Sequence, residues 1–154
     1  MKYKRLSGKE LEGLQEQFIE FLVVNGITAD DWVKLKDNDP PAASRMVDSF
    51  SDVMYEGWMR NITHLEVVLP KEVLCFYCQP QQIVLVGMST SAADMDFTQI
   101  EDMSEVAQHH ETVEIYTKTK PYSKQREIEV FEMMQRGAQA ADSTLFNALC
   151  LALD

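Results

Sequence analysis

The feature that most constrains the fold is a change in the spacing of apolar residues along the chain. In the first 61 residues they recur every three or four positions, as on one face of an α-helix. Between residues 62 and 88 they fall in short runs rich in β-branched and aromatic side chains, which are typical of strands. After residue 123 the helical spacing returns. Helices, then strands, then helices is the order of an α+β fold and differs from the alternation of a doubly wound parallel sheet.

Three helices are expected in the N-terminal part. The first spans about 8–24 and begins with a capping box, in which the side chains of Ser7 and Glu10 each accept a hydrogen bond from the other residue's backbone N–H. A short second helix has the sequence ADDWVKLK. The third follows the cap residue Asp39 and continues to about residue 61.

An antiparallel meander of three strands is expected next, with the sequences ITHLEVVL, VLCFYC and IVLVGM. Residues 111–117 predict a fourth strand or a longer loop, and residues 118–122 predict a turn around Pro121. Two C-terminal helices follow: KQREIEVFEMMQR, and a last helix capped by Asp142 or Ser143. We expect the C-terminal helices to pack on one face of this small sheet of three to four strands.

The length of the chain limits its domain organisation. Its 154 residues suffice for one domain with a sizeable core and are few for two. We therefore expect a single domain over residues 1–154. Its parts would be a helical part (1–61), the meander (62–88), an acidic loop or helix (89–117) and a second helical part (118–154).

Acidic residues dominate the chain, with 25 acidic against 14 basic residues and a formal net charge of −11. This charge argues against nonspecific binding to nucleic-acid phosphates. It is unevenly placed, because residues 72–117 contain eight carboxylates and no Lys or Arg. Such a stretch is either a solvated surface or a surface that steers a basic partner. We call residues 94–114 of this stretch the acidic segment. Its residues expected to make contact are Asp94, Asp96, Glu101, Asp102 and Glu105.

Basic residues gather at two other places. Four lie near the N-terminus: Lys2, Lys4, Arg5 and Lys9. Four more lie before the first C-terminal helix: Lys118, Lys120, Lys124 and Arg126. The second group is the other expected contact surface, since basic residues that the fold gathers on one face could meet an acidic partner, or an RNA locally despite the overall charge.

No targeting or membrane-spanning segment is expected. The basic N-terminus is not followed by the apolar region of a secretory signal, and every apolar stretch is far shorter than the roughly 18–20 residues of a membrane span. Three cysteines, an odd number, do not suggest a disulfide framework. We therefore expect a cytoplasmic protein with reduced thiols.

Cys75 and Cys78 have the CxxC spacing of zinc sites and redox motifs. A strand directs positions i and i+3 to opposite faces, so the two thiols share a site only if the chain turns there. Further zinc ligands would have to include residues such as His109 and His110. The favoured interpretation has one cysteine in the core, the other on the sheet surface, and no cofactor. A small zinc-binding or hydrolytic protein is the alternative.

Four blocks of the sequence carry a resemblance. They are MKYKRLSGKELEGLQEQFIEFLVVNGITADDW, FSDVMYEGWMRNITHLE, KQREIEVFEMMQRGA and LFNALCLAL. Together they resemble a family of short bacterial proteins classified only as a domain of unknown function, and the resemblance spans most of the chain. It implies no mechanism and no functional residues.

The sequence alone therefore predicts a non-enzymatic protein, an adaptor or regulator, that binds another macromolecule through its acidic segment. The expected partner is a protein with a basic surface. Bulk nucleic acid and membranes are not expected as partners, and the sequence leaves a homodimer open.

Overall fold

A computed structural model describes residues 1–109 and 111–153 of the chain. The chain divides into two compact units, Met1–Trp58 and Met59–Asp154, and each is described by itself. The single domain expected from the length stays a prediction. In the part of the chain that the structure describes, no helix combines the length and apolar character that a membrane span requires.

Unit 1 is helical. It holds α1 (Gly8–Gly13), α2 (Gln15–Val24), α3 (Ala29–Asn38) and most of α4 (Pro40–Asn61). The prediction of one helix over 8–24 is wrong, because Leu14 has φ −114° and ψ 24° and separates α1 from α2. It follows Gly13, and glycine is a weak helix former. The capping box at the start of α1 is confirmed.

Aromatic rings form the centre of unit 1. Phe18 lies 5.1 Å from Trp32 and 5.0 Å from Phe50, measured between ring centroids, and Phe50 is almost completely buried. The N-terminal segment is held by α4, since the backbone N–H groups of Lys2 and Tyr3 both donate to the carboxylate of Asp52. Edge-to-face ring packing and these hydrogen bonds hold the helices of unit 1 together.

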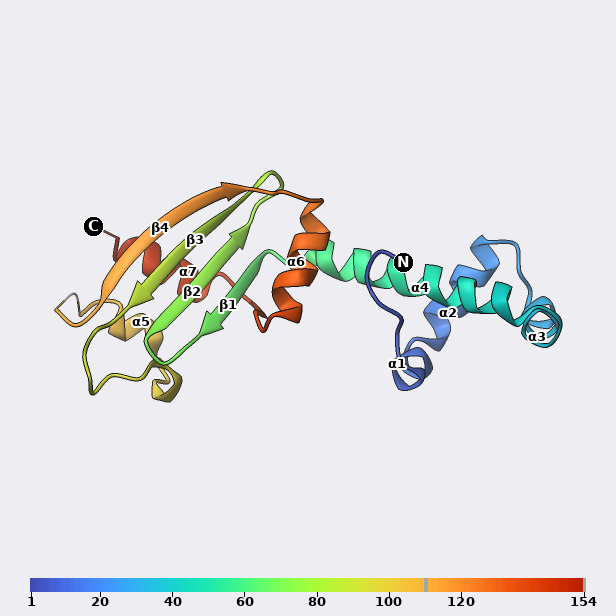
Figure 1. Cartoon of the computed structure of the whole chain (residues 1–154), viewed down its shortest axis with the longest axis horizontal. Helices are drawn as coiled ribbons and strands as arrows, with labels where there is room; N and C mark the ends of the chain where they lie inside the picture. Colours follow the sequence, from blue (N-terminus) through green and yellow to red (C-terminus); the bar gives the residue numbers. More distant parts are fainter. Residues whose placement is uncertain (110, 154) are drawn as a thin grey trace. The chain divides into compact units, whose positions relative to one another are not determined.

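Unit 2 is built on a five-stranded antiparallel sheet (Figure 1). The strands are β1 (His64–Val68), β2 (Glu72–Cys78), β3 (Gln82–Ser89), β4 (Glu114–Pro121) and β5 (Gln139–Ala141). They are ordered β4-β3-β2-β1-β5, and each neighbouring pair is antiparallel. The α+β class is confirmed, with one or two more strands than expected.

The fourth and fifth strands lie at the edges of the sheet, and β4 confirms the strand alternative for residues 111–117 with a shift towards the C-terminus. Residues 118–120 belong to β4, so the turn predicted over 118–122 is wrong. Pro121 is the last residue of an edge strand, a position that proline tolerates because no neighbouring strand needs its missing N–H. β5 is only three residues long and pairs with β1. It is too short to produce a recognisable alternation in the sequence.

One face of the sheet is covered by helix and loop. Val73, Cys75, Val86 and Met88 point to this side and are at most 1% exposed. They form a core cluster with side chains of α7 (Thr144–Leu151), η1 (Phe97–Gln99) and the residue after α5 (Met103–Val106). Figure 1 shows α7 and α5 behind the strands. We call this the covered face.

The alternate residues of the same strands point to the other side of the sheet. Val67, Leu74, Phe76 and Leu85 lie there and are half-buried, whereas Leu65, Cys78 and Ile83 on the same side are at most 3% exposed. The other C-terminal helix, α6 (Arg126–Gln135), contributes Met133 to this side, so the two C-terminal helices do not share a face. We call this second side the open face.

Candidate functional site

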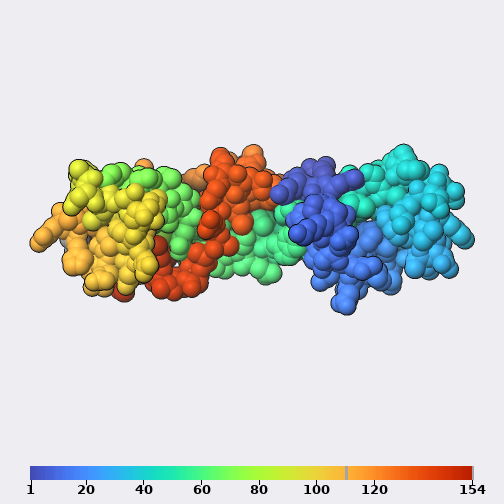
Figure 2. All heavy atoms as spheres, turned by 90° about the horizontal axis from the view of Figure 1, so that it is seen from below, coloured from blue at the N-terminus to red at the C-terminus, as the bar shows by residue number. Residues whose placement is uncertain are grey.

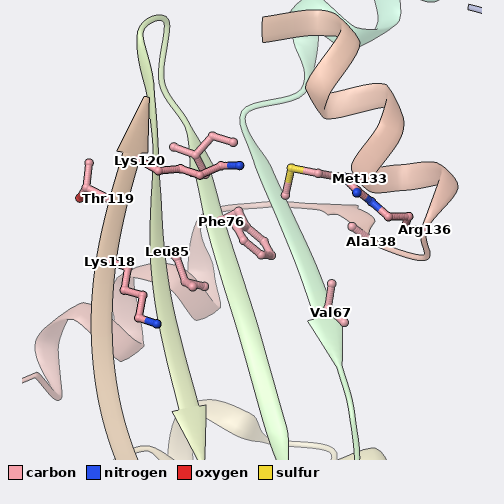
Figure 3. Close-up of a pocket in the computed structure, with 10 residues that line it drawn as sticks. Val67, Phe76, Leu85, Lys118, Thr119, Lys120, Met133, Arg136 and Ala138 are labelled. Atoms are coloured by element: carbon pink, nitrogen blue, oxygen red, sulfur yellow. The ribbon is translucent and has the colours of Figure 1, made fainter. Parts of the chain in front are cut away.

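A pocket of about 450 Å³ lies on the open face (Figure 3). Its floor takes apolar residues from three neighbouring strands: Val67 from β1, Phe76 from β2, and Ile83 and Leu85 from β3. Phe76 and Leu85 are directly paired across the strands. The volume is within the range of sites that bind small molecules or the side chains of a partner.

Cationic side chains lie on two opposite sides of this floor. Lys118 and Lys120 project from β4, and Arg136 follows α6 on the opposite side, as Figure 3 shows. Lys118 pairs directly with Leu85 in the sheet, which places its stem beside the floor. Of the ten described residues that line the pocket, these three are cationic and none is acidic. The site therefore combines an apolar floor with a cationic rim, in a protein of net charge −11.

A glycine and a tyrosine fix β4 against the rest of the sheet. The ring of Tyr116 lies against the backbone of Gly87, where any Cβ atom would overlap the ring. The Tyr116 hydroxyl donates to Oε1 of Glu72 at 2.9 Å, so the side chain crosses from β4 over β3 to β2. Burial, helped by this carboxylate, raises the pKa of Tyr116 to about 12. A tyrosine packed over a strand glycine in this way holds the strand that carries Lys118 and Lys120.

The four basic residues expected as one contact surface have different roles. Lys118 and Lys120 line the pocket. Lys124 is ion-paired with Glu132 at 2.7 Å. Arg126 is mostly buried, and its guanidinium donates to the backbone carbonyls of Met59, Ile62 and Cys78. Arg126 therefore joins α6 to the ends of α4 and β2, and its charge is used inside the fold.

The acidic segment lies on the surface of unit 2, where Figure 2 shows it in yellow tones. Two of its carboxylates serve the local fold. Asp96 accepts from the backbone N–H and the hydroxyl of Thr98, hydrogen bonds that lower its pKa. Asp102 accepts from the backbone N–H of Glu105 and caps α5. Asp94, Glu101 and Glu105 are exposed.

One comparison with known proteins identifies the family of this chain. A family model described as a family of unknown function, DUF6495, matches residues 1–154. The chain belongs to this family. No curated protein and no solved structure matches the chain. The predicted membership of a family of unknown function is thereby confirmed, and the function of this family member has to be argued from its own geometry.

The cysteines of this family member lie on different sides of the sheet. Cys75 belongs to the covered face, and Cys78, three residues along the same strand, points to the opposite side. Cys78 is buried there as well, so the expectation that one of the two cysteines lies on the sheet surface is wrong. Burial raises the pKa of Cys75 to about 12 and that of Cys78 to about 11, so both thiols are protonated at neutral pH. Protonated thiols are poor nucleophiles.

The histidines of the zinc alternative do not join these thiols. His109 is exposed after the end of α5, and His110 lies outside the described residues. Across residues 1–109 and 111–153, no group of three or more His, Cys, Asp and Glu side chains is arranged to hold a metal ion. The zinc alternative stays a prediction without support from this geometry.

Sequence reasoning missed the floor of the pocket and one of its cations. Phe76 and Leu85 were visible only as parts of strands that are apolar at almost every position. Such continuous apolar strands are typical of sheets that are covered on both faces, which is the signal that could have indicated a second binding face. Arg136 carried no signal, because its nearness to β1 depends on the tertiary path of the chain.

Proposed function

We propose that this protein is a non-enzymatic binding protein that contacts another macromolecule through the open face of its sheet. One observation carries the proposal. The floor formed by Val67, Phe76 and Leu85 is accessible, and three cations surround it. An apolar surface with a charged rim is the usual composition of a recognition site, in which the apolar centre supplies affinity and the rim supplies selectivity.

The side chains of the pocket favour a binding role over catalysis. Its floor consists of hydrocarbon side chains, which can exclude water but cannot transfer protons. Tyr116 and Cys78 also lie on this face, and their pKa values are raised to about 12 and about 11, so both are neutral at pH 7. Lys118, Lys120 and Arg136 can orient an anionic group through charge-assisted hydrogen bonds.

The charge distribution restricts what can bind. With a net charge of −11, the chain repels a polyanion at long range, and the rim of the pocket attracts a carboxylate only at short range. The ligand that fits is therefore an apolar surface that carries a few negative charges. The exposed carboxylates Asp94, Glu101 and Glu105 support a second candidate surface for a basic partner.

Site-specific photocrosslinking in the cells that make the protein tests the proposal. A benzophenone amino acid replaces Leu85 on the open face, or Ala93 beside the acidic segment, or Asn147 as an exposed control on α7. We expect an adduct with one recurrent macromolecule from position 85. The adduct should disappear in a Lys118→Glu/Lys120→Glu background and persist in Lys124→Glu.

The other outcomes distinguish the candidates. An adduct from position 93 and none from position 85 would assign recognition to the acidic segment. No adduct from position 85 would overturn the open-face proposal. For the zinc alternative, elemental analysis of the purified protein should then show stoichiometric zinc, and chelation should lower the melting temperature, since metal binding is coupled to folding at structural sites.

A further inference from the structure

We infer that the occupant of the open face is an acidic amphipathic α-helix of a partner protein. This inference rests on the proposed function and specifies its ligand. It depends on two properties of the pocket, the width between its two cationic sides and the spacing of its two lysines. It also depends on how α7 packs on the covered face of the same sheet.

The width of the site fits one helix. The lysines stand on β4 and Arg136 lies beside β1, and the strand order places three inter-strand steps between β4 and β1. Each step is about 4.8 Å, so the cationic sides are separated by roughly 14 Å. An α-helix with its side chains measures about 10–12 Å across. One helix can therefore lie on the floor with its flanks against both cationic sides.

The two lysines match the repeat of a helix. Lys118 and Lys120 are two residues apart on the same strand face, which separates their Cβ atoms by about 6.8 Å along the strand. Residues i and i+4 on a helix are about 6 Å apart along its axis. Two acidic residues at i and i+4 on one flank would each face a lysine, and an acidic residue on the other flank would face Arg136.

The covered face shows how this sheet packs a helix. α7 places Leu145 and Leu149, which are four residues apart, on the core of the covered face together with Phe146. On a partner helix parallel to β4, leucines at this spacing would meet Leu85 and Ile83, which are two residues apart on β3 and both line the pocket. A partner helix beside α6, over the part of the open face that α6 leaves accessible, would complete the three-layer arrangement that the apolar composition of β2 and β3 favours.

A helix explains the site better than an added strand does. β4 is an edge strand, and a peptide strand could pair with it. Such a strand would extend the sheet sideways and leave Val67, Phe76 and Leu85 uncovered. Lys118 and Lys120 also belong to the kind of charged edge that opposes strand pairing between copies. A helix instead uses the floor and the cations together.

The test uses defined peptides and the full chain. The probe is a fluorescein-labelled, helix-stapled 18-residue peptide with leucines on one face and glutamates on both flanks. A second peptide has lysine in place of every glutamate, and a third has the acidic composition in scrambled order. Fluorescence anisotropy measures binding to the wild type, to Lys118→Glu/Lys120→Glu, and to Lys124→Glu as the matched control outside the pocket.

We expect the acidic peptide to bind the wild type at least tenfold more tightly than the scrambled peptide. The Lys118→Glu/Lys120→Glu variant should lose at least tenfold of this affinity and gain affinity for the lysine peptide. Lys124→Glu should bind like the wild type. Raising the salt concentration from 0.05 M to 0.5 M should weaken binding of the acidic peptide, because the rim charges are exposed.

Several results would overturn the inference. Equal binding of ordered and scrambled peptides would show attraction by charge without helix recognition. If decanoate displaces the labelled peptide at a lower concentration than unlabelled peptide does, the site belongs to an acyl carboxylate. If the protein alone has twice the mass of one chain in solution, the site belongs to a second copy. If the peptide does not bind while position 85 still crosslinks a macromolecule, the helix is wrong and the proposed function stands. If position 85 gives no adduct, the proposed function itself fails.

Discussion

The two faces of the sheet in unit 2 are made by alternate residues of the same strands, yet they differ in what covers them. On the covered face Val73, Cys75, Val86 and Met88 are sealed by α7 and the segment around η1 and α5. On the open face, Phe76 and Leu85 are equally apolar and only half-buried. A sheet face of this composition that remains accessible is a candidate interface, because large exposed apolar surfaces are otherwise disfavoured.

The largest difference between the faces should appear in stability. Leu149→Ala on α7 removes a fully buried side chain from the covered face and should lower the free energy of unfolding by about 3 kcal/mol. Leu85→Ala on the open face removes a half-buried side chain and should cost about 1 kcal/mol. Urea unfolding followed by far-UV circular dichroism measures both. Equal losses would mean that the open face is sealed in solution.

The basic residues near the open face provide a second contrast. Arg126→Ala leaves the carbonyl groups of Met59, Ile62 and Cys78 without their donor and should cost about 3 kcal/mol. Lys124→Ala removes an exposed ion pair with Glu132 and should cost less than about 0.5 kcal/mol. The same unfolding experiment compares them. A small effect at Arg126 would contradict its role as the link between α6 and the sheet.

Packing on the open face itself can be tested at Gly87. A methyl group there overlaps the Tyr116 ring, so Gly87→Ala should cost about 2 kcal/mol. In a Tyr116→Ala background the same substitution should cost much less, because the overlap is gone. A double-mutant cycle measures this coupling. Additive effects would show that the ring does not lie over the glycine.

The smallest expected effect is a pH dependence of the free energy of unfolding that comes from His64 on the covered face. Burial lowers the pKa of His64, although Asp142 opposes the shift, and the ring stacks on Tyr77. The unfolded chain then binds a proton near pH 6.5 that the folded chain does not bind until lower pH. Stability is therefore fully present above pH 6.5 and falls as the pH decreases towards the folded-state pKa of His64.

His64→Phe keeps the stacked ring and removes this titration. Between pH 7.5 and pH 5.5 the variant should lose less stability than the wild type, as measured by urea unfolding at each pH. Glu66, whose pKa is raised by burial and by Asp142, contributes with the opposite sign and is unchanged in both proteins. His109→Asn is the exposed control, and an equal slope in His64→Phe and the wild type would contradict the prediction.

Local patterns in the sequence determined the class and most of the elements. The α+β order follows from the change in apolar spacing, and the start of α1 follows from a capping box that involves only four consecutive residues. Two predictions that proved wrong also concerned local structure. Leu14 interrupts the first helix, and β4 continues through Lys118 and Lys120 to Pro121.

Only the tertiary structure decided the candidate site. Val67, Phe76, Leu85, Lys118 and Arg136 come from five separate parts of unit 2, and strand order and register bring them to one face. It also decided that Lys120 lines the pocket while Arg126, six residues along, is used by backbone carbonyls inside the fold. The physical reason is that periodicity and capping act over a few neighbouring residues. Pairing and burial join residues far apart in the chain, and no local pattern specifies which residues they will join.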